Sequence, residues 1–194
     1  LKTMADVVAA IKADPTKVVF GAGGTVGSQD WMKAAITARA AGLNPRSMRF
    51  VAFEGGGEAL TALQGGHVHI YSGDASEASE QIKAGAKIRV IAVMADKRLE
   101  GGLAGVPTAK EQGFDIEWPI IRGFYVGPKV SDADYKVWAD TFGTMMATPG
   151  FARLRADRGL FPFARTGAEL DAYVKSQVAM YRKLAAEFGL NVAN

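Results

Sequence analysis

The sequence predicts an α/β fold, in which a parallel-rich sheet with flanking helices is followed by a group of C-terminal helices. Before Asp96, an apolar run, a glycine-rich turn and a helical pattern succeed one another three times. This rhythm is typical of parallel strands joined by crossover helices. After Pro128 the sequence contains helical patterns only. These terminal helices have no sheet of their own and must pack against something else.

Short apolar runs beside glycines or turn residues predict the strands. They are Lys17–Gly21, Arg49–Phe53, Val68–Tyr71, Ile88–Met94 and a last one, Ile120–Val126, which Arg122-Gly123 interrupts. Helical spacing of apolar residues predicts the helices. They are one around Val7–Ile11 that stops at Asp14-Pro15, then Ser28–Ala41 with Gly42 as its C-cap, Glu58–Gln64, Ala75–Ala84, Asp132–Ala147 with Ser131 as its N-cap, Pro149–Arg158 and Gly167–Phe188.

The composition narrows the function classes. The 194 residues include no cysteine, which excludes disulfides, thiolate metal sites and cysteine nucleophiles. The net charge of +3, from 23 basic and 20 acidic residues, is too balanced to favour nucleic acid as a partner. Apolar stretches such as Val90–Met94 are far shorter than the ~20 residues that cross a bilayer, so no direct membrane insertion is expected. The chain starts at Leu1 without an initiator Met or a signal peptide, and we expect that an upstream segment has been removed.

The first candidate binding element is the glycine-rich turn Gly21–Ser28. It follows a strand and opens a helix, a place where backbone N–H groups and the helix dipole bind anions. It is not a dinucleotide motif, because Val26 stands where the third glycine belongs, and it lacks the Gly-Lys-Ser/Thr ending of a P-loop. A turn made only for tight geometry is the open alternative.

Two further turns, Glu54–Glu58 and Ser72–Glu77, also join a strand to a helix. The three glycines Gly55–Gly57 indicate a close approach to the backbone. Asp74 and Glu77 have the spacing of a capping pair, and capping is the simpler role for Asp74. Because strand-to-helix turns of a parallel sheet lie at the carboxyl ends of the strands, the three turns are expected to converge there and to suit a small carboxylate or phosphate ester.

Arg122 and the two histidines are the remaining polar candidates. Arg122 lies in an apolar run predicted to be a buried strand, where it needs an anionic ligand or an internal salt bridge, for instance to Asp74. His67 and His69 alternate along one strand and share a face. Two histidines without a nearby carboxylate make a poor metal site, and no nucleophile motif accompanies them as a catalytic base.

A series of stretches carries a family resemblance. They are Gly21–Ser28, Phe53–Leu63, Gly65–Val68, Gln81–Gly85, Lys97-Arg98, Val106–Thr108, Glu111–Gly113, Arg122–Phe124, Gly127-Pro128 and Thr166–Leu184. In this order they resemble the substrate-binding proteins of tripartite tricarboxylate transporters, the TctC or Bug family. The likeness covers nearly the whole chain.

The resemblance implies a two-lobed, periplasmic-binding-protein-like fold of type II that closes on its ligand. Residues 1–121 would form the second, α/β lobe, and residues 122–194 the crossover strand and the helices of the first lobe, whose N-terminal part is absent. It also implies a periplasmic receptor and no enzyme, no cofactor and no metal. The implied partners are a small organic anion and the membrane subunits of the transporter.

The resemblance also suggests which residues bind the ligand. The matching positions are Gly24, Thr25, Ser28 and Gln29 in the first turn, Gly55 and Gly56 in the second, Asp74 in the third, and Arg122 near the hinge crossing. Glu54 and Asp30 depart from the family, where Lys and His are frequent. The expected ligand is a small organic anion, namely a di- or tricarboxylate, a hydroxy acid or an acidic amino acid. Together with Asp74, the acids Glu54 and Asp30 favour a ligand with a cationic or hydroxyl portion over a simple tricarboxylate.

Two other function classes stay open. An enzyme on a doubly wound sheet would act on a small carboxylate or phosphate ester with His69 or Asp74 as base, but no activated nucleophile or metal cluster accompanies them. An effector-binding domain of a regulator shares the two-lobed architecture, and an upstream helix-turn-helix segment would distinguish it.

Overall fold

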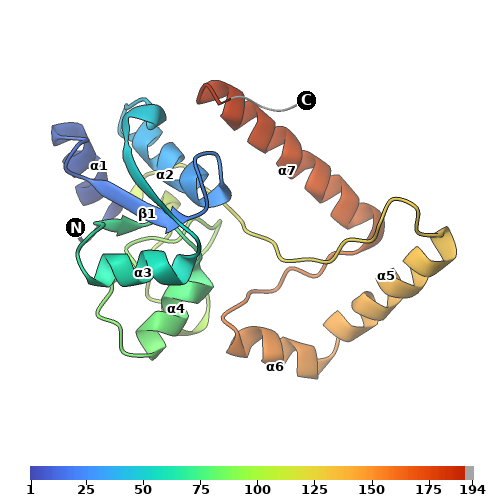
Figure 1. The fold of residues 1–194 in the computed structure, drawn as a ribbon. Coiled ribbons are helices and arrows are strands. Elements are labelled where there is room, and N and C mark those ends of the chain that lie inside the picture. Colours follow the sequence, from blue (N-terminus) through green and yellow to red (C-terminus); the bar gives the residue numbers. More distant parts are fainter. Residues whose placement is uncertain (191–194) are drawn as a thin grey trace. The chain divides into compact units, whose positions relative to one another are not determined.

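The structure, a computed structural model, describes residues 1–190 and divides into two compact units (Figure 1). Unit 1 is Leu1–Pro119 and unit 2 is Ile120–Asn194. Within residues 1–190, none of the helices combines the length and the hydrophobicity that a membrane-spanning segment requires.

Unit 1 contains a three-stranded parallel sheet with the order β2-β1-β3. The strands are β1 (Val19–Gly23), β2 (Arg49–Phe53) and β3 (Ile70–Tyr71). Val19 is opposite Arg49, and Phe20 is opposite both Phe50 and Ile70. The central strand β1 is buried along most of its length, whereas β2 is an edge strand that is largely exposed.

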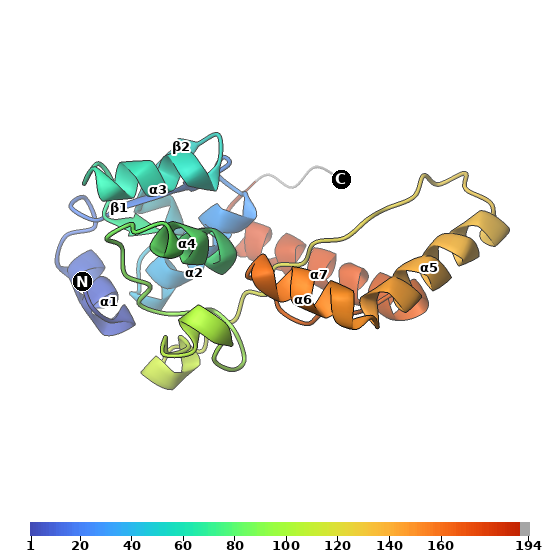
Figure 2. The ribbon, with the colours of Figure 1, turned by 90° about the horizontal axis from the view of Figure 1, so that it is seen from below.

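Four α-helices flank this sheet. They are α1 (Met4–Ala13), α2 (Gln29–Ala40), α3 (Gly56–Gln64) and α4 (Ala75–Lys83), and short 3-10 turns lie at Pro45–Ser47, Gly101–Leu103 and Lys110–Gln112. The chain crosses from β1 to β2 through α2, and back past β1 to β3 through α3. Since parallel crossovers are right-handed, these opposite steps put α2 and α3 on opposite faces of the sheet, as Figures 1 and 2 show.

The core of unit 1 lies between these layers. Phe20 on β1 and Trp31 on α2 are each only 2% exposed, and burial of such side chains contributes about 1.5–3 kcal/mol each. On the α3 face, Val19, Ala62 and Val68 form a further buried cluster. Gly21 is required beneath it, because a Cβ at this position would lie 3.0 Å from both Phe53 and Val68 side chains.

Unit 2 is helical, with α5 (Asp132–Met146), α6 (Pro149–Asp157) and α7 (Gly167–Glu187). Ser131 and Thr148 cap α5 and α6 through their hydroxyls, as their residue types favour. Phe124, Phe142 and Trp138 stack in a row, and Phe163 packs edge-on against Tyr173 at 4.8 Å between ring centroids. Among the residues of unit 2 that the structure describes, Leu184 and Phe188 alone are buried.

The predicted α/β class and helices are confirmed, with small shifts at the ends. Gly42 follows α2 with a φ of 78°, as a C-terminal glycine should. Two predicted strands are wrong. In Ile88–Met94, only Val93 pairs, through an isolated parallel bridge with Thr108. Ile120–Val126 has no regular secondary structure and does not pair with any described strand. An apolar run becomes a strand only where a neighbouring strand pairs its backbone, which periodicity cannot show.

Candidate functional site

The three strand-to-helix turns meet at the carboxyl edge of the unit 1 sheet. The Gly24 N–H donates to the Phe53 carbonyl at 2.9 Å, which joins the first turn to the end of β2. The Ser72 hydroxyl donates to the Asp30 carbonyl at 3.0 Å, which joins the third turn to α2. We call this edge, formed by Gly24–Ser28, Glu54–Gly56 and Ser72–Asp74, the sheet-edge site. The predicted convergence is thereby confirmed.

The first turn is shaped by glycine and by a helix cap. Gly24 and Gly27 have φ values of 78° and 90°, in the left-handed region that side chains avoid. Ser28 is the N-cap of α2, and its Oγ accepts the Trp31 N–H at 3.2 Å and donates to the Gly23 carbonyl at 3.4 Å. Gln29 begins the helix, while Thr25 is exposed beside Gly24. The Ser28 hydroxyl therefore orders the turn, and Thr25 leaves a hydroxyl at its surface.

The second turn comes close to the other two. Gly55 is the N-cap of α3 and has no side chain with which to cap it. A Cβ on Gly23 would lie 3.3 Å from the Gly55 backbone. A Cβ on Gly56 would overlap the Tyr71 hydroxyl and the Glu77 carboxylate. The close approach predicted from the three glycines is thus confirmed, and the side chains of Tyr71 on β3 and Glu77 on α4 account for it at Gly56.

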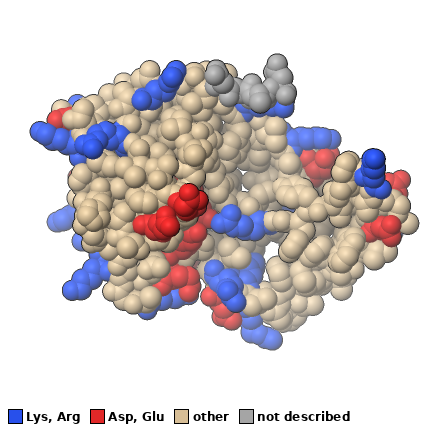
Figure 3. All heavy atoms as spheres, viewed as in Figure 1, with Lys and Arg blue, Asp and Glu red and all other residues tan. Residues whose placement is uncertain are grey.

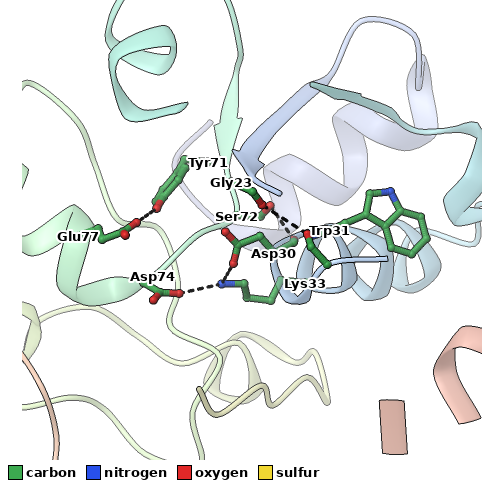
Figure 4. A network of polar contacts seen from close by, with 9 residues as sticks. Gly23, Asp30, Trp31, Lys33, Tyr71, Ser72, Asp74 and Glu77 are labelled. Atoms are coloured by element: carbon green, nitrogen blue, oxygen red, sulfur yellow. Dashed lines mark hydrogen bonds and ion pairs between the residues drawn. The ribbon is translucent and has the colours of Figure 1, made fainter. Parts of the chain in front are cut away.

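The third turn corrects the predicted capping pair. Asp74 stands at the N-cap of α4, but its side chain makes no capping hydrogen bond. Its Oδ1 lies 3.4 Å from Lys33 Nζ, and the same nitrogen lies 2.7 Å from Asp30 Oδ1 (Figure 4). Glu77 accepts a hydrogen bond from the Tyr71 hydroxyl instead of reaching back to the helix start. Both acids of the predicted pair therefore have other partners.

Lys33 is a residue of this site that the sequence analysis missed. Its side chain is only 5% exposed, and the side chains of Asp30 and Asp74 are 13% and 9% exposed. The signal was present: Lys33 stands three residues after Asp30 within an otherwise apolar stretch of α2, where a buried ammonium needs a partner.

Burial controls the ionisation of two side chains here. Burial raises the pKa of the Asp30 carboxyl, and the nearby Lys33 ammonium opposes this only in part. Burial also raises the pKa of the Tyr71 hydroxyl, and its hydrogen bond to Glu77 acts in the same direction. Tyr71 is therefore a hydrogen-bond donor at all physiological pH values.

The site combines backbone donors with an excess of acid. Asp30 and Asp74 both pair with the ammonium of Lys33, and Glu77 adds a third carboxylate beside the Tyr71 hydroxyl. Figure 3 shows acidic atoms gathered on the visible face of unit 1. The N-termini of α2, α3 and α4 point N–H groups towards the same edge. Helix N-termini suit a carboxylate, while the acids suit an ammonium or hydroxyl group. Together they can hold a small molecule that carries both kinds of group.

Arg122 and the histidines differ from their predicted settings. Arg122 is exposed and lies in unit 2, in an extended segment rather than a buried strand, so the argument from a buried charge does not apply. His69 accepts the Val19 N–H through Nδ1 at 3.1 Å, which supports the start of β1. Within residues 1–190, no group of three or more His, Asp or Glu side chains is placed to hold a metal ion.

Comparison with known proteins gives a family match over almost the entire chain. Residues 1–190 match the family model TctC, described as tripartite tricarboxylate transporter family receptor. A UPF0065 protein of Agrobacterium vitis, from the TAR-I ttuE-ttuC' intergenic region, is 30% identical over 193 residues, which are 97% of this chain and 54% of that protein. A UPF0065 protein from the gbd 5' region of Cupriavidus necator is 24% identical over 98% of this chain and 56% of its own length. The chain thus spans about half the length of these relatives.

Solved structures show the same fold. A TctC solute-binding protein from Polaromonas, solved without ligand, is 22% identical with a TM-score of 0.71, over 96% of this chain and 62% of that one. The periplasmic binding protein BugD is 20% identical with a TM-score of 0.70, over 98% of this chain and 63% of its own. A structure described as a periplasmic transporter has a TM-score of 0.74 at 19% identity, over 96% of this chain and 60% of that one.

Proposed function

Because the chain belongs to the family of tripartite tricarboxylate transporter receptors, we propose that it is the ligand-binding part of a periplasmic solute-binding receptor. Members of this family are solute-binding receptors and not enzymes. The receptor captures a small organic anion and presents it to the membrane subunits of a tripartite transporter. It retains the solute by closing a second lobe over the sheet-edge site, a hinge motion that only contacts of the closed state can drive.

The observation that carries this proposal is the convergence of three helix N-termini at one edge of the sheet. The backbone links Gly24 to Phe53, and the Ser72 hydroxyl links the third turn to Asp30. Neither Gly55 nor Asp74 caps its own helix with a side chain. A ligand carboxylate can therefore take first-turn N–H groups that the N-cap residues leave unused.

The acids at the same edge narrow the ligand class. Asp30 and Asp74 share the single ammonium of Lys33, and Glu77 adds a further carboxylate at the start of α4, so an entering molecule that carries only carboxylates meets like charges. A hydroxy acid or an acidic amino acid adds a donor that these carboxylates accept. We therefore propose a di- or tricarboxylate that also carries a hydroxyl or ammonium group.

Binding residues follow from this geometry. In our proposal the ligand carboxylates are held by the main-chain N–H groups of Gln29, Gly55 and Gly56, and the Thr25 hydroxyl adds a donor. Gly24, whose N–H donates to the Phe53 carbonyl, shapes the turns that present these groups, together with Ser28 and Asp74. Arg122 supplies a planar guanidinium fork, which suits a carboxylate, from its exposed segment.

We also propose that residues 1–121 form one lobe and that residues 122–194 complete a second lobe with polypeptide that this chain does not include. The helices of unit 2 leave large apolar side chains uncovered: Trp138 is 52% exposed and Leu154 is 55% exposed. This chain covers only 60–63% of the solved relatives. Apolar faces of this kind normally belong to an interface.

Calorimetric titration with succinate, L-malate, citrate and L-aspartate tests the receptor function. At least one acid binds and is recovered unchanged, and L-malate binds more tightly than succinate because of its hydroxyl group. Arg122→Ala weakens binding by roughly 10-fold or more, the scale of a charge-assisted pair. Lys175→Ala, an exposed cation of α7, is the matched control and leaves the affinity unchanged.

The outcomes separate the parts of the proposal. Absence of binding by all four acids contradicts the sheet-edge site as an anion site. Tighter binding of succinate than of L-malate contradicts the ligand class alone, and unchanged binding by Arg122→Ala removes that residue from the site. Chemical conversion of a bound acid would favour the enzyme alternative.

Tryptophan fluorescence tests the proposed second lobe. Trp31 and Trp118 are buried at 2% and 4% exposure, so iodide quenches Trp138 selectively. Adding the part of a family member that this chain does not span, as a separate polypeptide, should cover Trp138 and reduce the quenching. Unchanged quenching in the presence of that polypeptide contradicts the assignment of unit 2 to a shared lobe.

A further inference from the structure

Lys33 links helix α2 to the start of helix α4 at the sheet-edge site. A lysine usually keeps its ammonium group in water, yet the Lys33 side chain is only 5% exposed. Its Nζ lies 2.7 Å from Asp30 Oδ1 on the first turn of α2 and 3.4 Å from Asp74 Oδ1 at the start of α4 (Figure 4). The buried ammonium thus holds carboxylates from two different turns in fixed places.

The start of α4 is unusual because its capping residues have other partners. Asp is among the best N-cap residues, but Asp74 makes no side-chain capping bond. Glu77, at the position that completes a capping box, accepts the Tyr71 hydroxyl. In the same unit, Thr3 caps α1 with a complete box and Ser28 caps α2. In α4, the Asp74 carboxylate therefore pairs with Lys33 and does not make the capping hydrogen bond.

We propose that Lys33 is a positioning residue of the receptor, which holds the Asp74 carboxylate away from the first-turn N–H groups of α4 and so keeps them for a carboxylate of the ligand. Lys33 does not touch the ligand and acts through Asp74. The inference rests on the proposed function for the identity of the ligand, but the restraint on Asp74 can be measured without any ligand.

Loss of Lys33 has a defined consequence in this account. The released Asp74 carboxylate turns to the N–H groups of Ser76 or Glu77 and caps its own helix. This intramolecular carboxylate occupies the place of the ligand carboxylate and competes with it. The measured effect of N-caps corresponds to roughly 5- to 30-fold in an equilibrium constant.

Amide hydrogen exchange measured by NMR tests the restraint. The informative variant is Lys33→Met/Asp30→Asn, compared with Asp30→Asn alone, because removing Asp30 avoids leaving two buried carboxylates without their cation. The Ser76 or Glu77 amide exchanges roughly 5- to 30-fold more slowly when Lys33 is lost, and adding Asp74→Ala restores fast exchange. Lys83→Met removes an exposed ion pair with Glu80 elsewhere on α4 and leaves these amides unchanged.

Whether the amide exchange at Ser76 or Glu77 becomes slower or faster distinguishes the positioning role of Lys33 from a merely structural role. If Lys33 only tied two turns together, its loss would loosen the start of α4, and the same amides would exchange faster. Faster or unchanged exchange in Lys33→Met/Asp30→Asn, or slow exchange that persists after Asp74→Ala, overturns the proposal.

Titration with L-malate adds the functional readout. Lys33→Met/Asp30→Asn binds L-malate roughly 5- to 30-fold more weakly than Asp30→Asn. Equal affinity of the two variants, together with slower exchange, overturns the claim that the α4 N–H groups serve the ligand. If Asp30→Asn and the wild-type chain both fail to bind L-malate, the proposed function fails for this acid, and the exchange data still decide the restraint.

Discussion

Helices α2 of unit 1 and α5 of unit 2 start alike and end in different environments. Both begin with a serine N-cap, Ser28 and Ser131, whose hydroxyl accepts a first-turn N–H. In α2, the eight residues Trp31–Ala38 are all buried, whereas none of the fifteen residues of α5 is buried. Local signals therefore specify both helices equally well, and only packing distinguishes them.

The difference extends to charges and aromatic side chains. The Lys33–Asp30 pair of α2 is buried, while the Lys136–Asp140 pair of α5 is exposed at 75% and 66%. Phe20 in unit 1 is enclosed, but Phe124 in unit 2 stacks on Phe142 and stays 78% exposed. Unit 1 thus has a buried core of its own, whereas the described residues of unit 2 leave several large apolar side chains exposed.

The largest expected effect comes from emptying the core of unit 1. Phe20→Ala should lower the free energy of unfolding by about 3–5 kcal/mol, because it leaves a cavity at the centre of the sheet. The matched change Phe124→Ala in unit 2 should cost less than about 1 kcal/mol, because that ring is mostly in water. Urea denaturation followed by circular dichroism measures both. Equal losses would mean that the two units share one core.

A second pair of variants compares the two serine caps. Ser28→Ala should cost about 1 kcal/mol of unfolding free energy, because α2 is packed into the core and cannot fray independently. Ser131→Ala should fray the first turn of α5 and leave the unfolding midpoint of unit 1 unchanged. The two readouts are the urea midpoint and amide exchange at Asp134. A shift of the unit 1 midpoint by Ser131→Ala would contradict this separation.

The smallest effect concerns the buried acid of α2 and depends on pH. Burial raises the pKa of Asp30 above its ordinary value of 3.8. Protonated Asp30 therefore contributes to the folding stability of the protein below pH 3.8, and this contribution is lost as the pH rises through the folded-state pKa. Asp30→Asn stays neutral throughout and should be more stable than the wild type at pH 7, with no gain at pH 3. Thermal denaturation at both pH values measures this. Destabilisation at pH 7 would show that the Lys33 pair outweighs burial.

Much of this fold could be predicted from local sequence signals. Ser28 and Ser131 mark helix starts, Gly42 marks a helix end, and the strand Arg49–Phe53 lies where its apolar pattern predicts. The convergence of the turns follows from the parallel rhythm alone. The resemblance to the TctC family, based on motifs in their order, is confirmed by the match over residues 1–190.

The sequence predictions that were wrong depend on contacts between residues that are distant in sequence. Asp74 has the residue type and spacing of a cap, yet it pairs with Lys33, which lies 41 positions earlier. Ile88–Met94 and Ile120–Val126 are apolar enough for strands, but strand formation requires a neighbour that one segment cannot specify. Arg122 lies exposed because its segment is not a buried strand. Sequence patterns predict local structure well, and the partners of buried charges and strand edges poorly.

The most direct test of the central claim is the mapping of L-malate and citrate binding by backbone amide chemical shifts in the 194-residue chain. We expect saturable shifts at Gly24, Thr25, Gly55, Gly56 and the first turn of α4, and unchanged shifts in α5 and α6. Shifts confined to unit 2, or no saturable shift at these three turns with either acid, would contradict the assignment of the sheet edge as the anion-binding site.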